Sequence, residues 1–147
     1  MSYRLHASLG YNLSLAARLQ ERRLDEALKT LGLTRITWCV LLGVGNEGLS
    51  KPSDLASFVG IDRTATSRAL RGMEADGLIE RTGGDGDKRT RHVKLTPLGQ
   101  DRIQAGTPFA VANNDAMATK LTEKEHRALL TLLGKLTDGE DAELSNF

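Results

Sequence analysis

The chain contains a single cysteine, and this scarcity excludes several kinds of site. Cys39 alone cannot form a disulfide within one chain or supply a cysteine-based zinc site. The three histidines, His6, His92 and His126, stand far apart and show no metal-ligand spacing. The sequence therefore predicts no metal site and no cofactor.

Long apolar runs are also missing. No stretch approaches the roughly 18 apolar residues of a membrane span, and no apolar segment follows a basic start as in a signal peptide. Aromatic residues make up only 4% of the chain, so aliphatic side chains must fill its core. We expect a cytoplasmic protein without a membrane partner.

Recognisable catalytic motifs are absent as well. The sequence has no nucleophile motif and no pair of carboxylates suited to a cleft. Gly83, Gly84 and Gly86 do not lead from a strand into a helix, so they are not a nucleotide-binding fingerprint. We therefore expect a protein that is not an enzyme.

Charge is present but unevenly distributed. The net charge is only +1 over 147 residues. Residues 81–94 hold five lysines or arginines and two acids, whereas residues 98–147 hold five basic and eight acidic residues. A polyanion would be attracted to only one of these regions.

The ends of the chain carry helical leucine patterns. They predict a first helix from about Tyr3 to Thr30, with a kink near Gly10, and a last helix from Thr122 to about Leu136. A further helix is expected from Thr96 to about Thr119, bent or broken near 106–108, and the acidic tail from Asp138 should be frayed. The leucines of these helices are more than one small core can bury, which favours packing of the helices against a second copy.

The middle of the chain reads as three short helices followed by a hairpin. Helices are expected at 35–45, from Pro52 to Gly60, and from Asp62 to about Ala75. Strands are expected at 78–81 and 92–95. This order is typical of the winged helix-turn-helix, which places one helix in the DNA major groove and a basic wing beside it.

Short polar side chains mark where these helices begin. A side-chain oxygen in front of a helix can accept a hydrogen bond from its first turn, and a glycine permits the tight turn between two helices. We expect helix caps at Thr34, Asp62, Thr96 and Thr122, and the turn at Gly60.

Three motifs in this order resemble the MarR family of bacterial transcriptional regulators. They are G-L-T-R-I-T-W-C-V-L at 32–41, M-E-A-D-G-L-I-E-R at 73–81 and D-G-D-K-R-T-R-H-V-K-L-T-P-L-G at 85–99. The last carries the family's wing signature, in which Asp87 and Arg89 precede a strand and L-T-x-x-G. The resemblance covers nearly the whole chain.

The resemblance implies a mainly α fold with a small β wing. Residues 1–31 and 98–147 would form dimerisation helices, and residues 32–97 the winged helix-turn-helix lobe. It further implies a homodimer on a pseudo-palindromic DNA operator, usually acting as a repressor that a small-molecule effector releases.

The candidate DNA contacts are polar positions at the start of the helix that opens at Pro52, on the helix from Asp62 to about Ala75, and in the wing. Arginine can read guanine, serine and threonine can reach phosphates or base edges, and a wing arginine suits the minor groove. We expect Asp87 to hold the wing rather than face DNA. The family often has an acid where Arg71 stands, so its role is open. The candidates are Lys51, Ser53, Arg63, Thr64, Thr66, Ser67, Arg68, Arg71, Lys88, Arg89 and Arg91.

Two further hypotheses concern ligands and redox chemistry. His6, Tyr11, Arg18 and Trp38 are candidates for a pocket that takes an aromatic acid or an acyl thioester, although core packing is the preferred interpretation of Trp38. A thiol-based oxidant sensor would have to use Cys39, whose mid-helix position favours an inert buried thiol. A partner-binding module with an unused wing is the remaining alternative.

Overall fold

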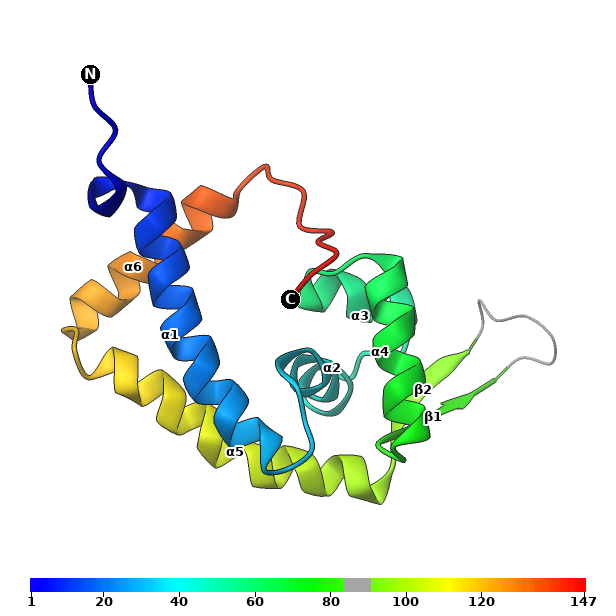
Figure 1. Ribbon diagram of the computed structural model, residues 1–147. Helices are drawn as coiled ribbons and strands as arrows, with labels where there is room; N and C mark the ends of the chain where they lie inside the picture. Colours follow the sequence, from blue (N-terminus) through cyan, green and yellow to red (C-terminus); the bar gives the residue numbers. More distant parts are fainter. Residues whose placement is uncertain (84–90) are drawn as a thin grey trace.

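A computed structural model of the protein describes residues 1–83 and 91–147 (Figure 1). The described elements are a short 3-10 helix η1 (Leu5–Ala7), six α-helices and two strands. In chain order these are α1 (Leu9–Lys29), α2 (Arg35–Gly45), α3 (Pro52–Val59), α4 (Arg63–Ala75), β1 (Ile79–Thr82), β2 (His92–Leu95), α5 (Pro97–Ala118) and α6 (Glu123–Thr137). No helix among these residues is long and apolar enough to cross a membrane.

Figure 1 shows two regions. Helices α1 and α6 lie on one side and α3, α4 and the strands on the other; α2 lies between them, and α5 runs below α2 from one side to the other. Strands β1 and β2 pair antiparallel, with Ile79 opposite Leu95 and Thr82 opposite His92. This arrangement is the winged helix-turn-helix that the middle of the sequence predicts.

The hydrophobic core belongs mainly to the lobe formed by α2, α3, α4 and the strands. Its fully buried side chains include Val40 and Leu41 of α2, Leu55 of α3 and Met73 of α4. Leu28 and Ile103 join this core from α1 and α5. Aliphatic side chains therefore make up most of the core, as the low aromatic content predicts.

Local capping bonds set most helix boundaries. The side chains of Thr34, Asp62, Thr96 and Thr122 each accept a hydrogen bond from a backbone N–H in the first turn of the helix that follows. Gly60 has φ +84°, a left-handed conformation that L side chains rarely adopt, and makes the tight turn between α3 and α4. The sequence predicted all five of these positions.

Two predicted details of the long helices are wrong. The first helix begins at Leu9 rather than Tyr3, because the Ser8 hydroxyl accepts from the Tyr11 N–H and ends the preceding turn. Helix α5 runs through Pro108 without a break. The packing of α5 against both α1 and α2 holds the helix together despite the roughly 3 kcal/mol that an interior proline costs.

The C-terminal tail also differs from its prediction, because its last residues are docked rather than frayed. Leu144 forms an isolated parallel bridge with Ile61 at the start of α4. The Asp62 N–H donates to the Leu144 carbonyl at 2.9 Å. The tail therefore connects the end of α6 to the winged lobe (Figure 1).

Candidate nucleic-acid interface

Helix α4 presents a polar face to solvent. Arg63, Thr64, Ser67, Arg68 and Arg71 are all exposed, while Leu70 and Met73 on the opposite side are buried. The spacing of three and four residues places Thr64, Ser67, Arg68 and Arg71 on one face, as the sequence predicts. Three arginines with short hydroxyl side chains between them make this face suitable for a polyanion.

Thr66 is the exception among the predicted contacts on α4. Its side chain is only 3% exposed, and its hydroxyl donates to the Asp62 carbonyl at 2.8 Å. The hydroxyl is therefore used within the helix and faces the core. This placement corrects its inclusion among the DNA contacts.

The start of α3 lies across a shallow cavity from α4. The cavity has a volume of about 380 Å³, and its lining includes Lys51, Ser53, Arg63, Ser67 and Arg81. Lys51 is the N-cap residue of α3, and its side chain makes no capping bond. Exposed Lys51 and Ser53 thus lie at a helix N-terminus, where backbone N–H groups attract phosphate oxygens.

Arg81 is a residue that the sequence analysis missed as a candidate contact. Its side chain extends from β1 into the cavity between α3 and α4, where Nε and Nη2 are buried and lack a hydrogen-bond partner among the described residues. The Glu74 carboxylate is 3.8 Å from Nε. The signal was the alternation along β1, which places Arg81 on the same inward face as buried Ile79.

The base of the wing is tied to the loop before α3. The Val93 N–H donates to the Ser50 carbonyl at 2.8 Å, and the Ser50 hydroxyl and His92 Nδ1 are 3.1 Å apart. Arg91 is exposed at the start of the returning strand. Asp87 and the predicted contacts Lys88 and Arg89 lie outside the residues that the structure describes.

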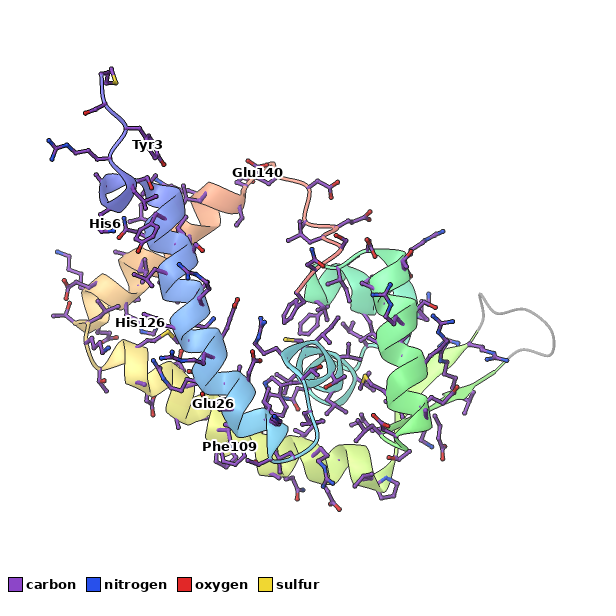
Figure 2. All side chains as sticks on the ribbon, viewed as in Figure 1. Tyr3, His6, Glu26, Phe109, His126 and Glu140 are labelled. Atoms are coloured by element: carbon purple, nitrogen blue, oxygen red, sulfur yellow. The ribbon has the colours of Figure 1, made fainter. Side chains whose placement is uncertain are left out.

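The four predicted ligand residues lie in separate parts of the chain. His6 lies in η1, before α1 (Figure 2), and its ring centroid is 5.0 Å from that of Tyr11. Exposed Arg18 donates to the Ser14 hydroxyl at 3.3 Å. Trp38 is buried in the lobe core, where it packs against Gly106 of α5. This position agrees with the preferred interpretation of Trp38 as a core residue.

A larger cavity lies between the end of α1, the start of α2, α4 and the tail. Its volume is about 680 Å³, and three cationic residues contribute to it, Lys29, Arg35 and Arg68. Apolar walls come from Leu33, Ile36 and Phe147, among others. No pattern in the sequence predicts this cavity, because its residues come from four segments that only the fold brings together.

Cys39 is half-buried on α2. Desolvation by this burial raises the pKa of the Cys39 thiol, and the positive charge of Arg35 lowers it by a smaller amount. A raised pKa keeps the thiol protonated at neutral pH, which disfavours nucleophilic chemistry.

Comparison with known proteins adds a family and a fold. A family model described as "MarR family" matches residues 31–90, which span the helix-turn-helix and the first part of the wing. The regulator BpsR of Bordetella bronchiseptica, described as regulated in its DNA binding by 6-hydroxynicotinic acid, has a similar structure. Its TM-score is 0.85 at 22% identity, covering 95% of this chain and all of that one.

Two other solved structures show the same architecture. A cysteine-to-serine mutant of MarR from E. coli, complexed with operator DNA, is 26% identical with a TM-score of 0.78, over 87% of this chain and 92% of its own. CouR from Rhodococcus jostii RHA1, bound to p-coumaroyl-CoA, is 18% identical with a TM-score of 0.81, and the match covers 94% of this chain and 97% of CouR. The chain is therefore similar to the MarR family over residues 31–90, and it shares the fold of these solved structures over most of its length.

Proposed function

We propose that this protein is a homodimeric, sequence-specific DNA-binding repressor that a small ligand, an aromatic acid or an acyl thioester, releases from its operator. The observation that carries the DNA-binding proposal is the exposed cationic face of α4 beside the N-terminus of α3. These two helices with the wing have the order and orientation of a helix-turn-helix reader, whose second helix enters the major groove.

The proposed interface assigns different tasks to different elements. Arg68 and Arg71 on α4 read base edges, and Thr64, Ser67 and Arg63 contact bases or phosphates. Lys51 and Ser53 hold a phosphate at the N-terminus of α3, and Arg81 faces the same phosphate from β1. Arg91, Lys88 and Arg89 belong to the wing, where Arg89 enters the minor groove.

The homodimer proposal rests on apolar side chains that one chain leaves uncovered. Helix α6 has no buried residue, and Leu130 and Leu132 are 58% and 55% exposed. Leu9 and Leu13 of α1 are likewise exposed. A two-fold partner covers both sets of leucines and sets the spacing between two recognition helices.

The effector proposal rests on the cavity between α1, α2 and α4. Apolar walls with a few cationic groups suit an aromatic carboxylate or an acyl thioester, whose ring packs and whose negative charge pairs. The solved structures similar to this chain include complexes with aromatic ligands, 2,4-dichlorophenol and p-coumaroyl-CoA. His6, Tyr11 and Arg18 remain the alternative ligand residues, at the far end of α1.

A gel shift tests the DNA-binding proposal directly. Purified protein is incubated with its own upstream intergenic DNA and excess nonspecific competitor, and a competitor-resistant shift with two chains per site is expected. Arg68→Ala should weaken operator binding by roughly 1–3 kcal/mol if Arg68 reads a base. Lys120→Ala, an exposed cation just after α5, is the matched control and should bind as the wild type does.

Other outcomes of this experiment discriminate among the hypotheses. Wild-type affinity in Arg68→Ala would remove Arg68 from the interface. An absence of shift on every fragment in a genome-wide selection would favour a partner-binding module. Aromatic acids and acyl-CoA thioesters are then added to the shifted complex, and release by none of them would contradict the effector proposal.

A further inference from the structure

The last residues of the chain dock on the winged lobe at two places. The first place is the turn between α3 and α4, where the Asp62 N–H donates to the Leu144 carbonyl at 2.9 Å and the Leu144 N–H donates to the Gly60 carbonyl at 3.3 Å. The second is Arg35, whose guanidinium lies 5.3 Å from the centroid of the Phe147 ring. The chain thus closes a loop from α6 back onto α4 (Figure 1).

Arg35 joins this tail to the rest of the molecule. Its guanidinium pairs with Asp25 at 2.8 Å and with Glu21 at 3.3 Å, both on α1, and also donates to the Phe147 carbonyl at 3.3 Å. The Arg35 side chain is only 20% exposed, so the contacts are partly shielded from water. One side chain therefore connects α1, α2 and the tail.

The docked tail borders the proposed DNA-reading face. Asp62 is the N-cap residue of α4, and the N-terminal residues of a recognition helix are the ones that reach base edges. Ser145, Asn146 and Phe147 line the same cavity as Arg68. A segment fixed at this position occupies one flank of the face that a DNA duplex would approach.

The segment that leads to this docking point is acidic. Asp138, Glu140, Asp141 and Glu143 are all exposed, and Glu140 marks the crossing from α6 toward the lobe (Figure 2). Asp141 and Glu143 lie within three residues of Leu144, hence within about 10 Å of the bridge to Ile61. That distance is comparable with the Debye length at 0.1 M salt, so these charges repel phosphates brought to α4.

We propose that residues 138–147 form an autoinhibitory strap. The strap rests on the proposed function: docked at Gly60–Asp62 and on Arg35, it places negative charge beside the DNA-reading face of α4 and lowers its affinity for DNA. Release of the strap removes those charges from the flank of α4, so DNA binding becomes tighter.

Two kinds of variant separate docking from charge. Leu144→Pro with Phe147→Ala removes the N–H donor to Gly60 and the ring on Arg35, and so releases the strap. Asp141→Asn with Glu143→Gln keeps the docked backbone and removes two charges. Glu26→Gln with Asp115→Asn neutralises two exposed acids on α1 and α5 and is the matched control for charge.

The measurement is fluorescence anisotropy with a labelled random-sequence duplex of about 30 base pairs, at several KCl concentrations. At low salt, both strap variants should bind roughly fivefold to tenfold tighter than the wild type and the control, and the difference should shrink as salt rises. Amide hydrogen exchange at Asp62 gives a readout without DNA: it should be slow in the wild type and faster in the release variant.

The outcomes distinguish this inference from the function on which it rests. Binding by the wild type supports the proposed function, whatever the variants do. Equal or weaker binding by both strap variants overturns autoinhibition, and a gain that persists at high salt overturns its electrostatic origin. If no variant binds any duplex, both proposals fail, and the exchange at Asp62 still reports whether the tail docks.

Discussion

The winged lobe and the terminal helices cover their apolar side chains in different ways. In the lobe, Val40, Leu41, Leu55, Leu70 and Met73 of α2, α3 and α4 are almost completely buried within one chain. In α6, no residue is buried, and Leu129, Leu130, Leu132 and Leu136 are each more than two-fifths exposed. The lobe thus has its own core, whereas α6 has an exposed apolar face, which in the proposed homodimer a second copy covers.

This difference separates two sources of stability. Burial of a leucine contributes about 1.5–3 kcal/mol, and the lobe gains it on folding of one chain. The leucines of α6 gain it only on association, which depends on protein concentration. Changes in the two regions should therefore produce different phenotypes, one in oligomeric state and the other in the stability of the lobe.

The largest expected effect comes from a charge placed on the exposed face of α6. Leu130→Glu with Leu132→Glu should convert the dimer to a monomer, because two buried carboxylates at a helix interface would lack partners. Operator affinity should fall by about a hundredfold or more, since the two half-sites would no longer be bound by linked lobes. Light scattering after size exclusion measures the mass, and anisotropy measures DNA binding.

A substitution elsewhere on α6 is the control for this prediction. Lys124→Glu reverses one charge on the same helix outside the leucine set and should leave the dimer intact. The circular dichroism spectrum of the double variant should still be that of a folded helical protein, because the lobe has its own core. A dimer that persists after both leucine substitutions would contradict the assignment of α6 to the interface.

The next largest effect should come from the contact between α5 and the lobe core. A Cβ added at Gly106 would lie 2.5 Å from Cζ3 of Trp38, so the indole ring must shift. Gly106→Ala should therefore lower the free energy of unfolding by about 1–3 kcal/mol. Thermal unfolding gives the stability, and Trp38 fluorescence reports the shift because this is the only tryptophan.

Gly10 provides the matched glycine. A Cβ there meets nothing within 4 Å, and the residue lies in the first turn of α1. Gly10→Ala should be neutral or slightly stabilising, by up to about 1 kcal/mol, because alanine favours helices. Equal destabilisation by both substitutions would show that close packing against Trp38 is not the cause.

The sequence predicted those parts of the fold that local chemistry determines. Thr34, Asp62 and Thr122 were identified as caps from residue type alone, and α2 has the predicted boundaries. The docking of Leu144 on Ile61 could not be predicted this way, because backbone hydrogen bonds between distant segments leave no periodic pattern in the chain. Arg81 was missed for a related reason, since the residues that line the cavity with it come from α3 and α4.

A smaller effect is expected at the boundary between the regions, where Cys39 tests the oxidant-sensor alternative. Because burial raises its thiol pKa, the reactive thiolate stays scarce at neutral pH and grows only as pH rises toward the raised value. Alkylation by iodoacetamide at pH 7.5 should be about tenfold slower in folded protein than in denatured protein. Peroxide should leave DNA binding unchanged in the wild type and in Cys39→Ser.

The opposite result would restore the redox hypothesis. Loss of operator binding in peroxide, reversed by dithiothreitol and abolished by Cys39→Ser, would require that the thiol become accessible. Since Cys39 and Arg35 are both on α2, such a result would also place the redox signal next to the contact that holds the tail.

The smallest effect concerns the cap of α6, whose contribution matters because the helix has no buried residue of its own. The Glu125 carboxylate accepts from the Thr122 N–H at 2.9 Å, and hydrogen bonds from Thr122 lower the Glu125 pKa. A lowered pKa in the folded state means that the stabilisation is complete above the unfolded pKa, about 4.3, and is lost as pH falls through the folded value.

Two substitutions isolate this charge-dependent cap. Glu125→Gln retains an amide oxygen that can accept from Thr122, so α6 should keep its cap and lose the pH dependence. Glu125→Ala should lose both the capping hydrogen bond and its pH dependence. The measurement is the helical circular dichroism of the wild type between pH 3 and 7, from which the signal of Glu125→Gln is subtracted at each pH. The subtraction cancels the titration of the other acids, which both proteins share. A flat difference would mean that the partner's leucines, rather than the local cap, determine where α6 begins.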